Sequence, residues 1–532
     1  MKNSRLLKYF LLFVLSFSLF SYLQSSPTFP DPDSFYHAKM AALIRDQGIV
    51  YDFPWLQFTI LKDYYIDHHF LYHLALVPFV TFLDPLIGIK LATATFGALL
   101  ILIFHWFLQK FKIKGAFFYS LLILTISPFI FRINLAKASA LSIIFLLIGV
   151  YFILKRKLWP LFILSFLYVW LFDGWPLVLI LTSLYIISDA IIKSIDSPAQ
   201  RIINIVNFIK NVFVGKNLKL FFSCFGGLAA GVIINPYFPK NLYFYWHHII
   251  KIAVINYKDK IGVGAEWYPY ALGDLIANDS LIFILLIITF TIFFISFIQS
   301  FASRTAKQTA PVEQRVSILS SAFFMFFFLA LTLRSRRNVE YFVPFAVILA
   351  AFTLNQPLSL FQKYWLLAKN WWQKRKILAS LLVLYFLIMI PATIGQNFWS
   401  LKNLFAAGYP VDKYKKISEW LANNTPEKSL IFHNDWDDFP PLFYYNTHNY
   451  YIAGLDPTFM YDFNKDLHKK WVDITTGRQE NISEIIGKEF GAEYVFVDKD
   501  HPFLENNLKR DGHFQMIYKD DEGKIYQLIQ NQ

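Results

Sequence analysis

Residues 86–107 of the sequence read LIGIKLATATFGALLILIFHWF. An α-helix needs about 20 mainly apolar residues to cross the hydrocarbon core of a bilayer, so this run predicts a membrane-spanning helix. Ten other apolar runs resemble it, several of them nearer about 15 residues long. They are residues 9–23, 117–131, 138–154, 158–172, 177–191, 220–234, 281–297, 316–333, 341–354 and 377–394. The sequence therefore predicts a polytopic α-helical membrane protein with about 11 to 13 transmembrane helices.

The composition supports this class. Of 532 residues, 56% are hydrophobic, 19% aromatic and 16% charged, against about 45–50% apolar and about 25% charged in soluble domains. These values argue against a soluble enzyme of two or three domains. The high Phe and Tyr content favours a membrane protein with aromatic belts at its interfaces. The one cysteine, Cys224, allows neither an internal disulfide nor a thiolate metal site.

The net charge of +13 is explained by topology. With a cytoplasmic N-terminus, the basic clusters between the runs all fall on the inner side, as the positive-inside rule requires. These clusters are Lys110, Lys112 and Lys114; Lys155, Arg156 and Lys157; Lys193 to Lys216; Arg304, Lys307 and Arg315; and Lys363 to Lys376. The apolar stretch 70–83 is read as an interfacial helix, because it is too short to span. We therefore expect an integral protein of the plasma membrane and no nucleic-acid partner.

The chain divides into two parts. Residues 1–395 form the predicted membrane domain, with external loops at 25–85 and 235–280. Residues 396–532 are polar, with strand-like runs at 429–433, 450–453 and 494–497 and a hairpin pattern from 514 to 528. They predict a soluble α/β domain on the extracytoplasmic side. No nucleotide-binding glycine motif occurs, which argues against an ATP-driven pump.

The first external loop is rich in acidic residues. Asp31, Asp33, Asp63, Asp67 and His68 lie within it. Oxygen and imidazole ligands suit Mg²⁺ or Mn²⁺, so Asp33, Asp67 and His68 are candidate metal ligands. The alternative is that these side chains cap helices or are simply solvated.

The pattern Asp33-x-x-x-His37-x-Lys39 directly after a first span, followed by many spans and an external domain, resembles the GT-C class of membrane glycosyltransferases. Within that class it is most similar to the catalytic, STT3-type subunit of oligosaccharyltransferases. The resemblance implies that Asp33 engages the acceptor and the metal. Asp31 is the neighbour that could take its place.

Two further segments carry the resemblance. Glu266, in Gly264-Ala265-Glu266-Trp267-Tyr268-Pro269, matches the Glu that closes over the acceptor in STT3-type enzymes. Trp436 and Asp437 match part of the Trp-Trp-Asp-Tyr-Gly signature that reads the Ser or Thr of a glycosylation sequon, whereas Asp435, Asp438 and Phe439 do not match. The resemblance assigns Glu266 to catalysis and Trp436 and Asp437 to acceptor binding.

One departure from the family concerns the metal. STT3-type proteins carry a second acidic motif in the external loop after the third span, and here residues 132–139 read RINLAKAS, without a carboxylate. A metal would have to draw on Asp33, Asp67, His68 or Glu266. Otherwise the enzyme works without one, and the sequence leaves both possibilities open.

External arginines are candidates for the donor. Arg132, Arg336 and Arg337 lie on the outer side against the positive-inside bias. A guanidinium group binds phosphate oxygens bidentately and stabilises the charge that grows on a leaving phosphate. These residues are therefore predicted to bind the phosphate of a polyprenyl-linked sugar.

Together these features predict a glycosyltransferase that uses a polyprenyl-phosphate or -diphosphate donor, with Asp33 as general base or orienting group and Glu266 assisting. The acceptor is protein asparagine, as in oligosaccharyltransferases, or a lipid, glycan or cell-wall polymer. The incomplete Trp-Asp signature and the missing acidic motif favour the second group. A transporter or flippase of polyprenyl-linked sugars is the alternative from another class, disfavoured because the spans are almost free of charge near their middle.

Overall fold

The computed structural model describes residues 2–195, 205–302, 311–355 and 372–529. Every apolar run predicted to span the membrane is helical in it, which confirms the predicted fold class. The corresponding elements are α1 (Lys2–Gln24), α5 (Pro85–Lys110), α6 (Ala116–Leu122) with η1 (Ile123–Thr125) and α7 (Ser127–Ile133), α8 (Ser139–Leu154), α9 (Leu158–Leu171), α10 (Pro176–Ile195), α12 (Gly215–Ile233), α15 (Ser280–Ala302), α16 (Val312–Arg334), α17 (Val339–Leu354) and α19 (Lys376–Ala406).

The helices differ in their capacity to span. Within the described residues, five are long and apolar enough to cross a membrane, or up to eight if each bent pair counts as one span. The bent pairs are α6–η1 with α7, at 84°, α11 (Ile205–Val212) with α12, at 48°, and α14 (Leu272–Asn278) with α15, at 90°. Helices α8 and α9 are apolar but have only 16 and 14 residues, which is short for a bilayer.

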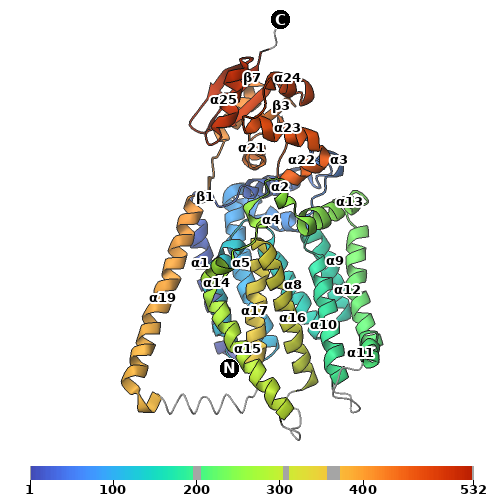
Figure 1. Ribbon diagram of the computed structural model, residues 1–532, viewed down its shortest axis with the longest axis vertical. Coiled ribbons are helices and arrows are strands. Elements are labelled where there is room, and N and C mark those ends of the chain that lie inside the picture. The colour runs from blue at the N-terminus through green and yellow to red at the C-terminus, as the bar shows by residue number, and fades with distance from the viewer. Residues whose placement is uncertain (1, 196–204, 303–310, 356–371, 530–532) are drawn as a thin grey trace.

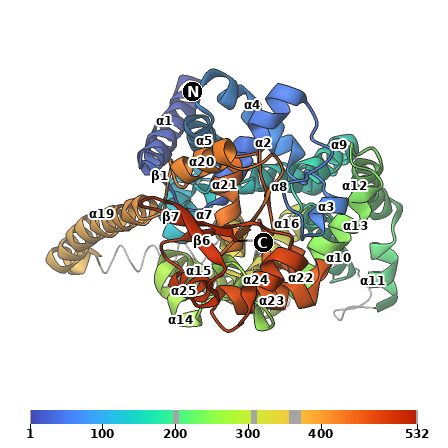
Figure 2. The same cartoon turned by 90° about the horizontal axis from the view of Figure 1, so that it is seen from above.

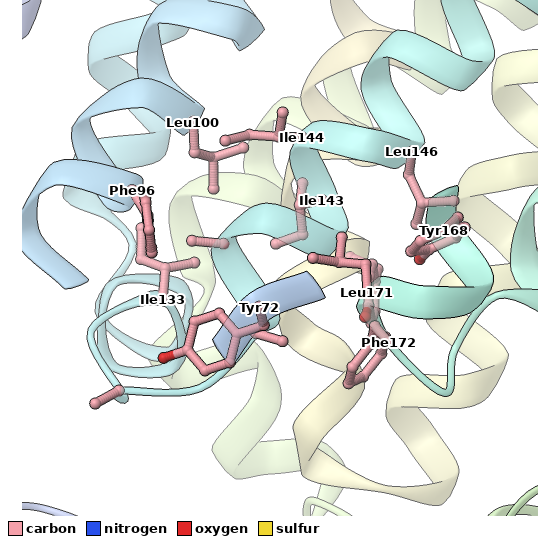
Figure 3. Packing of buried hydrophobic residues seen from close by; sticks show 14 of the residues in the cluster. Tyr72, Phe96, Leu100, Ile133, Ile143, Ile144, Leu146, Tyr168, Leu171 and Phe172 are labelled. Atoms are coloured by element: carbon pink, nitrogen blue, oxygen red, sulfur yellow. The ribbon is translucent and has the colours of Figure 1, made fainter. Parts of the chain in front are cut away.

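The helices pack side by side into a bundle (Figure 1). In its core, Tyr72, Phe96 and Ile133 come from three different elements and lie close to residues of α8 and α9 (Figure 3). Helices α9 and α12 approach closely because Gly227 and Gly231 of α12 face α9. A methyl group on Gly227 would lie 2.2 Å from the carbonyl oxygen of Phe162. Small residues spaced four apart are a common means of close packing between membrane helices.

Short elements cover the bundle end that faces the C-terminal domain, and the label of the N-terminus lies near the opposite end (Figure 1). Helix α4 covers most of the stretch expected to be interfacial and is 13 residues long. The predicted basic positions 304, 307 and 363 lie outside the described residues. The short elements are β1 (Thr28–Phe29), α2 (Asp33–Gln47), α3 (Leu61–Tyr64), α4 (Phe70–Phe82), α13 (Lys240–Trp246), η2 (His247–Ile255), η3 (Tyr257–Asp259), η4 (Ala265–Trp267) and η5 (Arg336–Asn338).

The C-terminal domain is built on a five-stranded mixed sheet of order β4-β3-β5-β7-β6. Strand β3 pairs in parallel with β4 and β5, and β7 pairs antiparallel with β5 and β6. The strands are β3 (Leu430–His433), β4 (Tyr450–Tyr451), β5 (Tyr494–Asp498), β6 (Phe514–Lys519) and β7 (Gly523–Leu528), at the positions that the sequence predicts.

Six α-helices and two further short helical elements complete the described part of the domain. They are α20 (Lys415–Asn424), η6 (Trp436–Asp438), α21 (Phe439–Tyr445), α22 (Pro457–Phe463), α23 (Lys465–Thr475), α24 (Ile482–Glu484), η7 (Ile485–Glu489) and α25 (Pro502–Asp511). The domain lies over the end of the bundle when seen from above (Figure 2). The expected boundary between residues 395 and 396 falls within α19, which continues to Ala406.

The segment between α1 and α4 forms backbone hydrogen bonds with the C-terminal part of the chain. Strand β1 pairs antiparallel with β2 (Tyr409–Pro410) just after α19. The approach is close at Gly408, where a Cβ atom would lie 2.1 Å from the carbonyl oxygen of Phe29. Further along, the amide of Tyr451 donates to the carbonyl oxygen of Trp55 at 2.7 Å. The aspartate-rich loop and the polar tail therefore lie at the same end of the molecule.

Candidate active site

A cavity of about 370 Å³ lies where the bundle end that carries the short elements meets the C-terminal domain. Most of the site residues predicted from the sequence line this cavity. The predicted residues that line it are Asp31, Asp33, His68, Arg132, Glu266, Arg337, Trp436 and Asp437. Asp67 and Arg336 are not among its lining residues.

Asp33 is the first residue of α2, directly after the rigid turn Pro30-Asp31-Pro32. Its amide donates to Oδ1 of Asp31 at 2.9 Å, which sets the two carboxylates side by side. Burial raises the pKa of Asp33 to about 6. The positive charge of Lys137 opposes this rise, and the negative charges of Asp31 and Glu266 add to it. The side chain is 28% exposed, so Asp33 faces the cavity with a carboxyl group that titrates close to neutral pH.

Lys137 lies among these carboxylates, in the turn between α7 and α8. Its Nζ atom is 2.8 Å from Oδ2 of Asp31, 2.9 Å from Oδ2 of Asp33 and 3.9 Å from Oε2 of Glu266. Burial alone would lower the pKa of Lys137, but the three carboxylates hold it above its usual range. The ammonium group therefore stays charged at neutral pH.

Glu266 is also paired with an arginine. Arg132 Nη1 donates to Oε2 of Glu266 at 2.5 Å, and Arg132 Nε donates to Oε2 of the buried Glu340 at 2.9 Å. Burial opposes ionisation of Glu266, but Lys137, Arg132 and Arg337 hold its pKa well below the usual range. Glu266 is thus a fixed anion in the site, and Arg132, which also lines the cavity, is paired with two carboxylates through Nη1 and Nε.

The two neighbouring arginines of η5 have different positions. Arg337 lines the cavity, stacks over the ring of Trp267 at 4.5 Å, and approaches Oε1 of Glu266 to 3.9 Å. Arg336 lies over the ring of Tyr270 and donates from Nε to the carbonyl oxygen of Pro269 at 3.2 Å. Of the two, the structure places only Arg337 where a bound group in the cavity would meet it.

Asp173 and His248 also line the cavity, with His248 Nδ1 2.6 Å from Asp173 Oδ2. Neither residue belongs to a motif found in the sequence. Burial opposes ionisation of Asp173, but His248 keeps its pKa low. His68 packs beside His248, with ring centroids 5.1 Å apart, and burial lowers the pKa of His68 to about 4. For Asp173 and His248, the only signal in the sequence is that both fall in loops predicted to lie on the same side as Asp33.

Asp67 points into a buried imidazole pair. Its Oδ2 atom is 2.7 Å from Nδ1 of His73, and Nε2 of His73 is 2.7 Å from Nδ1 of His37. Asp67 thus orients His37, the histidine of the Asp33-x-x-x-His37-x-Lys39 motif, through His73. Lys39 of the same motif donates to the carbonyl oxygen of Tyr444 in α21, which is a contact to the C-terminal domain.

These positions do not suit the expected metal site. Asp33 is paired with Lys137, Asp67 with His73, and His68 faces His248. Across the described ranges, no group of three or more His, Cys, Asp or Glu side chains is arranged to hold a metal ion. The residues present therefore do not fit Mg²⁺ or Mn²⁺ at the predicted ligands.

The Trp-Asp segment enters the cavity from the C-terminal domain. Asp435 and Asp438, which did not match the family signature, form a capping box around η6. This leaves Trp436 and Asp437 to line the cavity, where Trp436 lies against Gly264 of the loop that carries Glu266. Burial and the neighbouring aspartates raise the pKa of Asp437 to about 9, so Asp437 is a neutral hydrogen-bond donor at pH 7.

Solved structures of the GT-C class share this fold. AglB, an archaeal oligosaccharyltransferase from Archaeoglobus fulgidus in complex with an inhibitory peptide and a dolichol-phosphate, has a TM-score of 0.62 and 13% identity, covering 96% of this chain and 72% of AglB. ArnT from Cupriavidus metallidurans, bound to undecaprenyl phosphate, has a TM-score of 0.51 and 13% identity over 97% of each chain.

The arabinofuranosyltransferase AftD from Mycobacteria is also similar, with a TM-score of 0.50 and 10% identity. The match covers 98% of this chain and 40% of AftD. Neither a protein-family model nor a curated protein matches the sequence. The chain therefore has the GT-C fold at a level of identity that leaves its reaction to be argued from the site.

Proposed function

We propose that the chain is a glycosyltransferase that moves a sugar or oligosaccharide from a polyprenyl-phosphate or -diphosphate donor to an acceptor at the extracytoplasmic membrane face. The observation that carries the proposal is the row of alternating charges along the cavity. It runs from Asp31 and Asp33 through Lys137 and Glu266 to Arg337. Such a row presents a base at one end and an anion-binding group at the other.

Asp33 serves the acceptor. Its Oδ2 atom is held by Lys137, and Oδ1 has no hydrogen-bond partner within the described ranges. In the proposed step this oxygen accepts the proton of an acceptor hydroxyl while the acceptor oxygen bonds to the anomeric carbon of the sugar. Glu266, fixed as an anion by Arg132, stabilises the positive charge that develops on the sugar.

Arg337 serves the donor. The bond between the anomeric carbon and the phosphate oxygen breaks as the new bond forms, and the electron pair leaves with the phosphate. Arg337 donates charge-assisted hydrogen bonds to the phosphate oxygens and stabilises this growing charge, and His248 lines the same cavity. Phe131, Phe172 and Phe244 give this cavity an apolar lining. Polyprenyl phosphates are bound in the AglB and ArnT structures, which supports the same donor class here.

A hydroxyl group is the acceptor that this site supports best. The nitrogen of an asparagine amide shares its electron pair with the carbonyl group, so it needs stronger activation than a hydroxyl does. Here Asp31 and Glu266 are already paired with cations, whereas Asp33 keeps one oxygen beside its contact to Lys137 that can take up a proton. We therefore favour a lipid, glycan or polymer hydroxyl.

Protein asparagine is the second candidate. Trp436 and Asp437 lie beside the Glu266 loop, as the resemblance to oligosaccharyltransferases implies for sequon recognition. The inhibitory peptide in the AglB complex supports the same reading.

The test is transfer from labelled polyprenyl-phosphate sugars in membranes that contain the wild type, Asp33→Asn or Asp63→Asn. We expect Asp33→Asn to lower transfer by at least about 100-fold, because it removes the base without changing the shape. The exposed Asp63 of the same loop is the matched control. Equal turnover of wild type and Asp33→Asn would refute the assignment. Mass spectrometry of glycolipids and glycoproteins from cells with and without the chain identifies the acceptor.

A further inference from the structure

Three carboxylates from two distant segments surround one ammonium group in this cavity. Asp31 and Asp33 come from the first external loop, and Glu266 comes from η4 between α12 and α15. All three lie within 3.9 Å of Lys137 Nζ. Several carboxylate oxygens around one positive charge also characterise divalent-cation sites in proteins, although the described carboxylates are not arranged to hold a metal ion as they stand.

The ammonium group and a metal ion exclude one another at this point. Magnesium sits about 2.1 Å from its oxygen ligands in near-octahedral geometry, whereas Lys137 Nζ stands 2.8 and 2.9 Å from the two aspartates. An ammonium carries three N–H donors, enough for the three carboxylates. The Lys137 side chain is 15% exposed, so it belongs to the built wall of the cavity.

Positive side chains already stand beside these carboxylates. Asp31, Asp33, Glu266 and Glu340 face Lys137, Arg132 and Arg337. Lys137 thus supplies, next to Asp31 and Asp33, the positive charge that a divalent cation would otherwise supply.

We infer that the Lys137 ammonium group occupies the place of a divalent cation, and that this site orients its carboxylates and carries out its reaction without metal. The statement about the reaction rests on the proposed function, whereas the statement about the place of the cation does not. Lys137 thereby gains a specific role as the positioning residue of Asp31 and Asp33.

The first test measures metal binding to the full-length protein, purified in lipid nanodiscs, by electron paramagnetic resonance of Mn²⁺. Wild type should bind no stoichiometric Mn²⁺ up to about 1 mM, the weak end of protein oxygen sites. Lys137→Met keeps the length of the side chain and removes its charge, and it should gain one Mn²⁺ site that is lost again with Asp33→Asn. Lys428→Met removes an exposed charge on the C-terminal domain and should behave as wild type.

The second test measures transfer after prolonged chelation. Wild type should keep its full rate with EDTA. Lys137→Met should lose about 100-fold, the size of effect seen when one charge-stabilising donor is removed from an active site, and added Mn²⁺ should restore part of that loss.

One equivalent of Mn²⁺ bound by wild type and lost with Asp33→Asn would overturn the inference, and so would a folded Lys137→Met protein without a new site. The wild-type measurement decides the question even if Lys137→Met fails to fold. Failure of the proposed function would look different, since no variant would transfer sugar under any metal condition while the binding results stood.

Discussion

In the proposed reaction, the ionisation of Asp33 determines how the rate of transfer depends on pH. Burial among Lys137, Asp31 and Glu266 raises its pKa to about 6, so it is ionised above this pH and protonated below it. Lys137 and Glu266 stay charged on both sides of this pH. Because only the ionised form can accept a proton, transfer should be constant above about pH 7 and fall about tenfold for each unit below about pH 6.

The measurement is kcat/KM between pH 4.5 and 8.5. Enzyme held at pH 5 and returned to pH 7.5 should recover its full rate, which separates titration from unfolding. A flat profile down to pH 4.5 would contradict the role of Asp33 as base.

Asp67 has a structural rather than a metal-binding position. Asp67→Ala leaves the buried Nδ1 atom of His73 without its partner, and a buried polar group without a hydrogen bond costs about 1–3 kcal/mol. The variant should therefore unfold at a lower temperature than wild type in a thermal melt of the purified protein. The exposed Asp63 of the same loop provides the control, since Asp63→Ala should melt as wild type does. Unchanged stability of Asp67→Ala would contradict this assignment.

At the scale of single elements, helix α12 offers two adjacent glycines with opposite expectations. A Cβ atom on Gly227 would lie 2.2 Å from the backbone oxygen of Phe162, whereas one on Gly226 would lie 3.5 Å from the ring of the same residue. Gly227→Ala should therefore separate α9 from α12 and lower the melting temperature, and Gly226→Ala should be tolerated. Equal melting temperatures would show that α9 and α12 adjust to the added methyl group.

The position of each membrane helix could be predicted because hydropathy is a local property of the sequence. The bends that divide some of these helices could not be predicted. The 84° bend between η1 and α7 and the 90° bend before α15 depend on how neighbouring helices pack. The capping box of Asp435 and Asp438 was also missed, although acidic residues before a helix are a known capping signal.

The site itself could be predicted only in part. Asp33, Glu266 and Trp436 carry recognisable motifs, and the sidedness of the predicted spans placed them on one face. Lys137, Asp173 and His248 carry no motif. Their roles arise from long-range convergence, for example the approach of Lys137 to Asp33 and Glu266, which no short pattern encodes.

For the whole molecule, the sidedness of the chain can be measured by thiol labelling in intact cells. Tyr51, which follows α2, and Lys509 in α25 are exposed and suit substitution by Cys, and α2 and α25 lie toward the same end of the molecule (Figure 1). Both cysteines should react with a membrane-impermeant maleimide, while Lys112→Cys, in the turn after α5, should react only after permeabilisation. Background labelling should be low because the native Cys224 is buried. Labelling of the first two positions from opposite sides would contradict a shared site.

The pairing of β1 with β2 has a consequence for how the protein is made. Asp31 and Asp33 follow directly after β1, but their supporting strand begins only at Tyr409, and Trp436 comes later still. While the helix bundle is being inserted into the bilayer, Lys137 and Glu266 are therefore already present beside the two aspartates, but strand β2 and the Trp436 wall of the pocket are not. A product of premature termination before Tyr409 would be inserted yet lack one wall of the pocket, so the chain must be synthesised past Trp436 before the pocket is complete.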